Sequence, residues 1–313
     1  MDSRKVVIVG TGQVGASFAF ALMMSGAATH ILLTDKNKDL AEGHRMDLNH
    51  GLLFVPPVTI DTEETADYNT CDVAVVTAGA NQAPGQSRMD LVHQNTRIFK
   101  SLIPEVIDRF SPGILLIVTN PVDILTYVAL RLSGYDRHRV MGSGTLLDSA
   151  RFRSLLSDHC RIDPRNIHAH IIGEHGDSEV PVWSQTNIAG MALKSFCAGC
   201  DQRFGDNDRA KIVDRVKQAA YRIIRKKGAT YYAVSLALVR IIESIFRDEN
   251  SVLTVSSLID DYYGINDVCL SMPTIINRSG ASKWLPVELN DAETDSLRRS
   301  ADKLAKTLNE LAL

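Results

Sequence analysis

The stretch that decides the fold is VVIVGTGQVG, residues 6–15. Its first four residues are apolar and mostly β-branched, which is typical of a parallel strand buried on both faces. The glycines that follow, Gly10, Gly12 and Gly15, have the spacing G-x-G-x-x-G. Such glycines permit a tight turn, let backbone amides approach a pyrophosphate, and let the next helix pack against the strand. The stretch therefore predicts a strand, a phosphate-binding turn and a helix.

The residues after this turn continue the same pattern. Apolar residues at helical spacing are followed by a second strand, HILLTD (30–35), which ends in Asp35. Asp35 lies twenty positions after Gly15, where an acidic residue can accept hydrogen bonds from the ribose hydroxyls of a dinucleotide. A 2′-phosphate would meet a carboxylate there. The sequence therefore favours NAD over NADP, although Lys36 and Lys38 lie close by.

Strands and helices alternate along the rest of the N-terminal half. The pattern predicts strands over Asp72–Thr77, Ile114–Val118 and Arg139–Met141, separated by helices such as Met89–Phe110. Such alternation indicates an α/β fold with a doubly wound parallel sheet of the Rossmann type. Ligands bind at the carboxyl ends of the strands of such sheets. The loops Thr77–Gln82 and Thr119–Asp123 are therefore candidate site loops.

The pattern changes after Gly144, where an α+β substrate domain with antiparallel strands is expected. We predict helices over 146–159, 206–227 and 231–246, strand-like HAHII (168–172) and VPVW (180–183), strands over 252–258 and 268–276, and a last helix with an apolar stripe. The predicted domains are residues 1–143, which bind the dinucleotide, and residues 144–313, which carry the substrate chemistry.

Composition excludes several classes of function. The 34 basic and 37 acidic residues are interspersed and give a net charge of -3, so nothing would attract a nucleic acid. The sequence has no apolar run of about 18 residues, the length of a membrane span. Five cysteines, an odd number, argue against a disulfide framework and for a reducing compartment such as the cytoplasm.

Two of these cysteines form the pair Cys197-Ala-Gly-Cys200. Such a pair can bind a metal or undergo redox chemistry. Because no second pair and no suitably spaced histidine accompany it, we favour a solvated turn and expect no metal.

The stretch IIGEHGDSEVPVWS, residues 171–184, places a lone histidine between two acids and two glycines. In isolation His175 is interpreted as a loop residue, and a proton donor is the alternative. Asp148 and Arg151 are three positions apart on a predicted helix, so they share a face as a surface ion pair or as part of a site. Arg153 lies about 200° around that helix from Arg151 and must serve another surface.

These motifs together resemble the L-lactate dehydrogenases of the lactate/malate dehydrogenase family along essentially the whole chain. The matching stretches are GTGQVG, DLNHG, TAGANQAPGQSRMDLV, TNPVD, GSGTLLDSARFR, GEHGDSEVPVWS and KGAT. The type that the chain resembles is the bacterial one activated by fructose 1,6-bisphosphate.

The resemblance implies a role for each residue that matches the family motifs. His175 would donate a proton, Asp148 would orient it, and Arg88 would close over the reacting carbonyl from a mobile lid. The substrate would be bound by Arg151, through a two-pronged ion pair, and by Gln82, Asn120 and Thr230. NAD would be bound by Gly10, Gly12, Gln13, Val14, Gly15, Asp35, Tyr68, Thr77, Gly79, Ala80, Val118, Asn120 and Ser143.

The implied chemistry agrees with these residue types. Reduction of a 2-oxo acid delivers a hydride to the carbonyl carbon while negative charge grows on the oxygen. A histidine, with a pKa of ~6.5, can donate a proton there, and a buried carboxylate beside it favours the charged form.

Gln82 indicates which 2-oxo acid is the substrate. Malate dehydrogenases carry an arginine at this position, which pairs with the second carboxylate of their substrate. A neutral amide would leave that charge of oxaloacetate unpaired. Pyruvate is therefore the expected substrate and lactate the product, with a malate or broader L-2-hydroxy acid dehydrogenase as the alternative.

Arg153 and His168 match positions that bind fructose 1,6-bisphosphate in the allosterically activated bacterial enzymes, where two subunits share the phosphates. The resemblance therefore implies this effector and a homotetramer. Alternatively His168 is an ordinary strand histidine, as is His170, which is expected on the same strand face.

Overall fold

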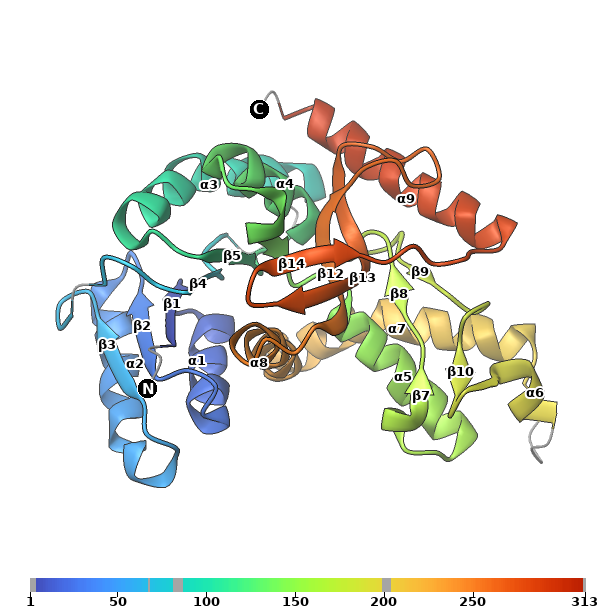
Figure 1. The fold of residues 1–313 in the computed structure, drawn as a ribbon, viewed down its shortest axis with the longest axis horizontal. Helices are drawn as coiled ribbons and strands as arrows, with labels where there is room; N and C mark the ends of the chain where they lie inside the picture. The colour runs from blue at the N-terminus through green and yellow to red at the C-terminus, as the bar shows by residue number, and fades with distance from the viewer. Residues whose placement is uncertain (1–3, 67, 81–86, 199–203, 312–313) are drawn as a thin grey trace.

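A nine-stranded sheet runs through the molecule with the order β14-β13-β12-β6-β5-β4-β1-β2-β3 (Figure 1). The computed structural model describes residues 4–66, 68–80, 87–198 and 204–311. The strands from β6 to β3 are parallel, so the predicted doubly wound sheet is confirmed. They are β1 (Lys5–Val9), β2 (His30–Thr34), β3 (Thr59–Thr62), β4 (Val73–Val76), β5 (Ile114–Ile117) and β6 (Val140–Gly142).

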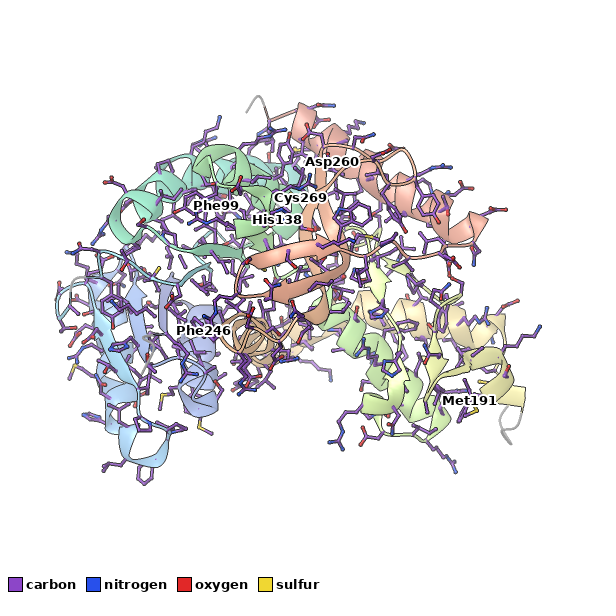
Figure 2. All side chains as sticks on the ribbon, in the orientation of Figure 1. Phe99, His138, Met191, Phe246, Asp260 and Cys269 are labelled. Carbon is purple, nitrogen blue, oxygen red and sulfur yellow. The ribbon has the colours of Figure 1, made fainter. Side chains whose placement is uncertain are left out.

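Helices cover both faces of these parallel strands. Phe18 and Leu22 of one face and Phe99 and Ile103 of the other are completely buried, and they belong to two separate apolar clusters. Figure 2 shows Phe99 beneath α3, where it packs toward the sheet. One face carries α1 (Gln13–Ser25), α2 (Lys38–His50) and α8 (Tyr232–Phe246), and the other α3 (Arg88–Phe110), α4 (Val122–Ser133) and α9 (Asp291–Asn309).

Three antiparallel strands from the C-terminal half extend the same sheet. They are β12 (Ser251–Ile259), β13 (Val268–Asn277) and β14 (Gly280–Trp284). Strand β12 pairs antiparallel with β6, with Ser256 opposite Gly142. Antiparallel strands were predicted for this half, and the structure adds that they join the sheet of the N-terminal half.

The rest of the C-terminal half forms a smaller lobe (Figure 1). Phe152, Leu156 and Ile212 belong to its own apolar cluster. Its helices are α5 (Leu146–Cys160), α6 (Leu193–Ala198) and α7 (Asp206–Lys227), and its strands are β7 (Ile167–His168), β8 (Ile171–Ile172), β9 (Val180–Pro181), β10 (Asn187–Ile188) and β11 (Met191–Ala192). Short 3₁₀ helices lie at Leu52–Phe54, Arg137–Arg139 and Pro164–Asn166.

Two details of this lobe differ from the sequence predictions. HAHII is not one strand, because β7 pairs with β10 and β8 pairs with β9 in separate small sheets. His170 lies between them in neither strand, so it does not share a strand face with His168. Cys197 lies in α6 and not in a solvated turn. Cys200 lies outside the described residues.

Among the described residues, no helix combines the length and the apolar character that a membrane span requires.

Candidate active site

The glycine turn after β1 has the shape that a dinucleotide requires. Gly10 has φ +98°, and a Cβ on it would lie 2.6 Å from the backbone nitrogen of Ala78. A Cβ on Gly15 would lie 1.9 Å from the carbonyl oxygen of Gly10. A Cβ on Gly12 would meet no atom within 4 Å, and Gly12 caps α1 without a side-chain hydrogen bond. The turn therefore leaves open space at the N-terminus of α1, where a pyrophosphate would bind.

Asp35 lies beside this turn at the end of β2. Its carboxylate accepts hydrogen bonds from the backbone nitrogen of Thr11 at 2.6 Å and from that of Asn37 at 2.9 Å. A pocket next to it is lined by Lys38, Thr62 and Glu63 among others. The carboxylate of Asp35 thus lies at the carboxyl end of β2 beside the glycine turn, where the predicted contact with the ribose hydroxyls would be made.

Three further predicted cofactor residues lie at the carboxyl ends of neighbouring strands. Thr77 donates its hydroxyl to the carbonyl oxygen of Gly10 at 2.6 Å. Val118 and Ser143 donate their backbone N–H groups to the ends of β4 and β5, at 2.9 and 2.8 Å. The structure thus brings them to the edge of the sheet where Gly10 lies, together with Gln13 and Val14 at the start of α1.

Tyr68 is not brought to this edge. Its ring packs edge-on against His30 and beneath the ammonium group of Lys5, the first residues of β2 and β1. Burial, together with the negative charge of Asp61, raises the pKa of the phenol well above its usual value. Its role as a cofactor residue stays a prediction from the resemblance.

The two candidate site loops are joined by Asn95, which the sequence reasoning missed. This amide is completely buried in α3. It accepts from the nitrogen of Ala80 at 2.8 Å and donates to the carbonyl oxygen of Asn120 at 2.8 Å. A Cβ on Gly79 would lie 2.3 Å from the methyl group of Thr119, so these loops are also in close contact. The available signal was a polar residue on the apolar face of α3, four positions before Phe99.

The predicted catalytic residues of the C-terminal half form one cluster. His175 lies between β8 and β9, and its Nδ1 is 2.5 Å from Oδ2 of Asp148 on α5. The other carboxylate oxygen of Asp148 accepts from Nη1 of Arg151 at 2.7 Å. Asp148 is 3% exposed, so it is not part of a surface ion pair. The His175 side chain is 27% exposed, which leaves its ring accessible.

The charges in this cluster stabilise one another. Burial would lower the pKa of His175, but the negative charge and hydrogen bond of Asp148 outweigh it and raise the pKa to about 9. Burial would raise the pKa of Asp148, yet His175 and Arg151 hold that pKa below its usual value. At neutral pH the cluster is therefore an imidazolium and a guanidinium on one carboxylate.

The backbone of His175 is positioned by a second buried acid, Asp123 of α4. Its carboxylate accepts from the nitrogen of His175 at 2.7 Å and from the hydroxyl of Ser256 at 2.6 Å. Burial raises the pKa of Asp123 to about 6, against these two hydrogen bonds. The sequence reasoning included Asp123 in the TNPVD loop but gave it no role, and Ser256 carried no signal.

The remaining predicted residues are placed as follows. Asn120 is exposed in the loop between β5 and α4, and Thr230 is half-buried between α7 and α8. Gln82 and the side chain of Arg88 lie outside the described residues.

The two residues implied for an activator lie on the other side of α5. The Nε of Arg153 donates to the carbonyl oxygen of Ala169 at 2.9 Å, next to the exposed His168. Burial, with the positive charges of Arg153 and His168 nearby, lowers the pKa of His170 to about 4. The structure thus brings Arg153 and His168 together here, beside a His170 ring that is neutral at pH 7.

Comparison with known proteins decides the family. Residues 4–142 match the model for the lactate/malate dehydrogenase NAD binding domain, and residues 145–312 match that for the lactate/malate dehydrogenase alpha/beta C-terminal domain. The chain belongs to the lactate/malate dehydrogenase family. The resemblance drawn from the motifs is confirmed.

Individual relatives place the chain near one branch of this family. It is 52% identical to an L-lactate dehydrogenase of Acetivibrio thermocellus over 98% of this chain and 97% of that one. It is also 52% identical to an L-lactate dehydrogenase of Thermoanaerobacterium saccharolyticum over 98% and 99%. A solved lactate dehydrogenase from a Medee basin deep-sea metagenome library superposes with a TM-score of 0.95 at 40% identity, with both chains fully covered.

A second solved structure, the minor L-lactate dehydrogenase of Enterococcus mundtii, superposes with a TM-score of 0.94 at 38% identity over 99% of each chain. The lactate/malate dehydrogenase described here is therefore an enzyme, and NAD is its cofactor.

Proposed function

We propose that the chain is an L-lactate dehydrogenase, which interconverts pyruvate and NADH with (S)-lactate and NAD. The observation that carries this proposal is the cluster in which Asp148 bonds both His175 and Arg151. It provides one proton donor and one carboxylate-binding group side by side, as the reduction of a small 2-oxo acid requires.

Arg151 binds the substrate carboxylate. One guanidinium nitrogen donates to Asp148, which fixes the plane of the group and leaves its other donors for a two-pronged bond. The Arg151 side chain is 16% exposed, so this ion pair forms where water screens it weakly.

His175 supplies the proton. Because Nδ1 is bonded to Asp148, Nε2 carries the proton that the substrate oxygen receives. A pKa of about 9 keeps the ring protonated at neutral pH. The glycine turn and Asp35 would hold the cofactor, whose reduced form, NADH, would supply the hydride for the carbonyl carbon. Asp123 positions the backbone of His175. From the resemblance, Arg88 and Asn120 contact the reacting oxygen and Thr230 lines the pocket.

Pyruvate is favoured over oxaloacetate because Gln82 offers no charge for a second carboxylate. Initial rates with pyruvate, oxaloacetate and bulkier apolar 2-oxo acids test this choice. We expect kcat/KM to be largest for pyruvate. A larger value for oxaloacetate would identify a malate dehydrogenase, and equal values would identify a broader L-2-hydroxy acid dehydrogenase.

Fructose 1,6-bisphosphate is the proposed activator. The support is the pair of Arg153 and the exposed His168, which lies across α5 from Arg151 and within the same lobe. An activator bound between subunits must favour both the assembled enzyme and its substrate-competent state. Rates measured with and without fructose 1,6-bisphosphate, in the parent and in Arg153→Gln, test this site. Equal activation of both proteins would refute it.

A homotetramer is proposed because large apolar side chains are exposed in groups. Phe20 and Met24 of α1 and Tyr232 and Leu236 of α8 are 52%, 54%, 68% and 66% exposed. Such clusters mark interaction surfaces. Light scattering coupled to size exclusion gives the oligomeric state, and a monomer at micromolar concentration would contradict the proposal.

Two proposals concern organisation and compartment. We propose residues 1–143 as the NAD-binding unit and 144–313 as the catalytic unit, joined through a shared sheet.

A cytoplasmic location is proposed because Cys71 and Cys269 are free, buried thiols, as is common in a reducing compartment. Burial raises the pKa of Cys71 to about 12.

A further inference from the structure

The loop that carries His175 contains two buried glutamates with opposite environments. Glu174 is 4% exposed, and its carboxylate bonds Ser178 and the ammonium group of Lys303, the latter at 2.8 Å. Glu179 is 6% exposed, but its Oε1 is buried with no hydrogen-bond partner among the described residues. An unsatisfied buried oxygen is costly, so its retention calls for an explanation outside packing.

Charged groups from three segments surround Glu179. They are Asp148 and Arg151 of α5, His175 of its own loop, and Lys217 of α7. Lys217 already donates to the carbonyl oxygen of Asp177 at 2.7 Å. From α9, Lys303 is engaged by Glu174.

The balance of these charges favours a protonated carboxyl. Burial raises the pKa of Glu179 first, and the negative charge of Asp148 raises it further. The positive charges of His175, Lys217 and Arg151 oppose this rise, and the result is a pKa of about 8. Glu179 is therefore a neutral acid at pH 7, beside a carboxylate that is ionised.

Ionisation of Glu179 would change what the cluster can bind. A second carboxylate near Arg151 would attract its guanidinium and repel the carboxylate of an incoming substrate. In the neutral form, the carboxylate of Asp148 bonds His175 and Arg151 without competition from Glu179, and the remaining donors of Arg151 stay available.

We propose that Glu179 is a positioning residue whose neutral form keeps Arg151 available for an anionic 2-oxo acid, and whose ionisation opposes substrate binding. The inference rests on the proposed function. The inference also extends the proposed function. It makes the affinity for the substrate, rather than the turnover rate, depend on a proton carried by a group that does not touch the substrate. By linkage, substrate binding above pH 8 must return the proton to Glu179.

The first test compares KM for pyruvate at pH 7 and pH 9 in the parent and in Glu179→Gln. The parent KM should rise about 20-fold, because ionisation of Glu179 contributes about 10-fold and loss of the His175 proton about twofold. The glutamine variant stays neutral, so its KM should rise only about twofold, while kcat of both proteins follows the same pH profile.

The matched control is Glu174→Gln in the same loop. It removes a buried charge that is paired with Lys303, so it should lower stability but keep the steep rise in KM of the parent. A steep rise in Glu179→Gln equal to that of the parent would overturn the proposal. An enzyme that does not turn over pyruvate at pH 7 would instead refute the proposed function.

A second measurement needs no variant. Oxamate, an unreactive isostere of pyruvate, is bound to the parent enzyme saturated with NADH at pH 8.5, and proton uptake is obtained from calorimetry in two buffers. We expect an uptake of about one proton per site, of which roughly three quarters goes to Glu179 and one quarter to His175. Uptake of only about a quarter would mean that Glu179 does not titrate, and would overturn the proposal.

Discussion

The nucleotide-binding turn and the catalytic cluster are built in different ways. The turn depends on backbone shape, since Gly10 and Gly15 leave no room for a Cβ and the strands around them pair in register. The cluster depends on side-chain charges, since His175 takes its partners from α5 and α4, 27 and 52 positions away. The turn is therefore sensitive to added side-chain volume, and the catalytic cluster is sensitive to pH.

The largest effect should come from removing the proton donor. His175→Asn should lower kcat for pyruvate about 1,000-fold, within the range that general acid catalysis contributes. NADH affinity should change by less than about twofold, because the turn shares no side chain with the cluster. Stopped-flow rates and fluorescence titration with NADH measure the two quantities. Loss of NADH binding together with turnover would show that the two regions are not independent.

The rates of the two reaction directions should depend differently on pH, whereas the affinity for NADH should not depend on pH. At saturating lactate, kcat for oxidation should rise about 50-fold from pH 7 to pH 9, because the neutral fraction of His175, with a pKa of about 9, rises from about one in a hundred to one half. Pyruvate reduction at saturation should change little over the same interval, because the bound substrate keeps His175 protonated. NADH affinity should stay flat. A flat profile for lactate oxidation would contradict the raised pKa of His175.

A smaller effect should follow from Arg151→Lys, which keeps the positive charge but removes the planar guanidinium that makes the two-pronged ion pair. We expect kcat/KM for pyruvate to fall about 30-fold, which corresponds to ~2 kcal/mol for one lost charge-assisted hydrogen bond. The change should reside mainly in KM. Rates over a range of pyruvate concentrations measure it, and a fall in kcat alone would mean that Arg151 acts on the transition state only.

The smallest effect on activity should come from Gly12→Ala. Its effect on stability is compared with that of a second single variant, Gly15→Ala. A methyl group on Gly12 meets no protein atom, so stability should be kept while the Kd for NADH rises about tenfold, or ~1.4 kcal/mol. A methyl group on Gly15 meets the carbonyl of Gly10 and should destabilise the free protein by about 1–3 kcal/mol. Thermal unfolding without cofactor distinguishes them, and equal Tm values would contradict the difference in shape.

Local patterns predicted much of the fold. The β-branched run before Gly10 and the strands over 114–118 and 268–276 were recognised because buried strands leave a run of mostly apolar residues in the sequence. Pairing between distant segments leaves no such local signal in the sequence. The sequence therefore gave no indication that β12 joins β6, or that HAHII divides between two sheets.

The candidate site shows the same limit. His175, Asp148 and Arg151 were named from motifs, and the structure brings them together. Asn95 and Asp123 were missed because their partners lie 25 and 52 positions away, on other loops. These hydrogen bonds are to backbone groups, which do not depend on the type of the partner side chain and so leave no sequence signature. The other bond of Asp123, from the hydroxyl of Ser256, spans 133 positions.

The junction between Gly142 and Ser256 bears on attempts to recombine this enzyme with relatives. A cut near residue 143 looks convenient, yet it separates β6 from β12 in mid-sheet. Each fragment expressed alone would expose the unpaired amides of a formerly central strand, a template for aggregation. Chimaeras that exchange cofactor preference must therefore transplant the β6–β12 seam as a matched unit, rather than splice one half to another.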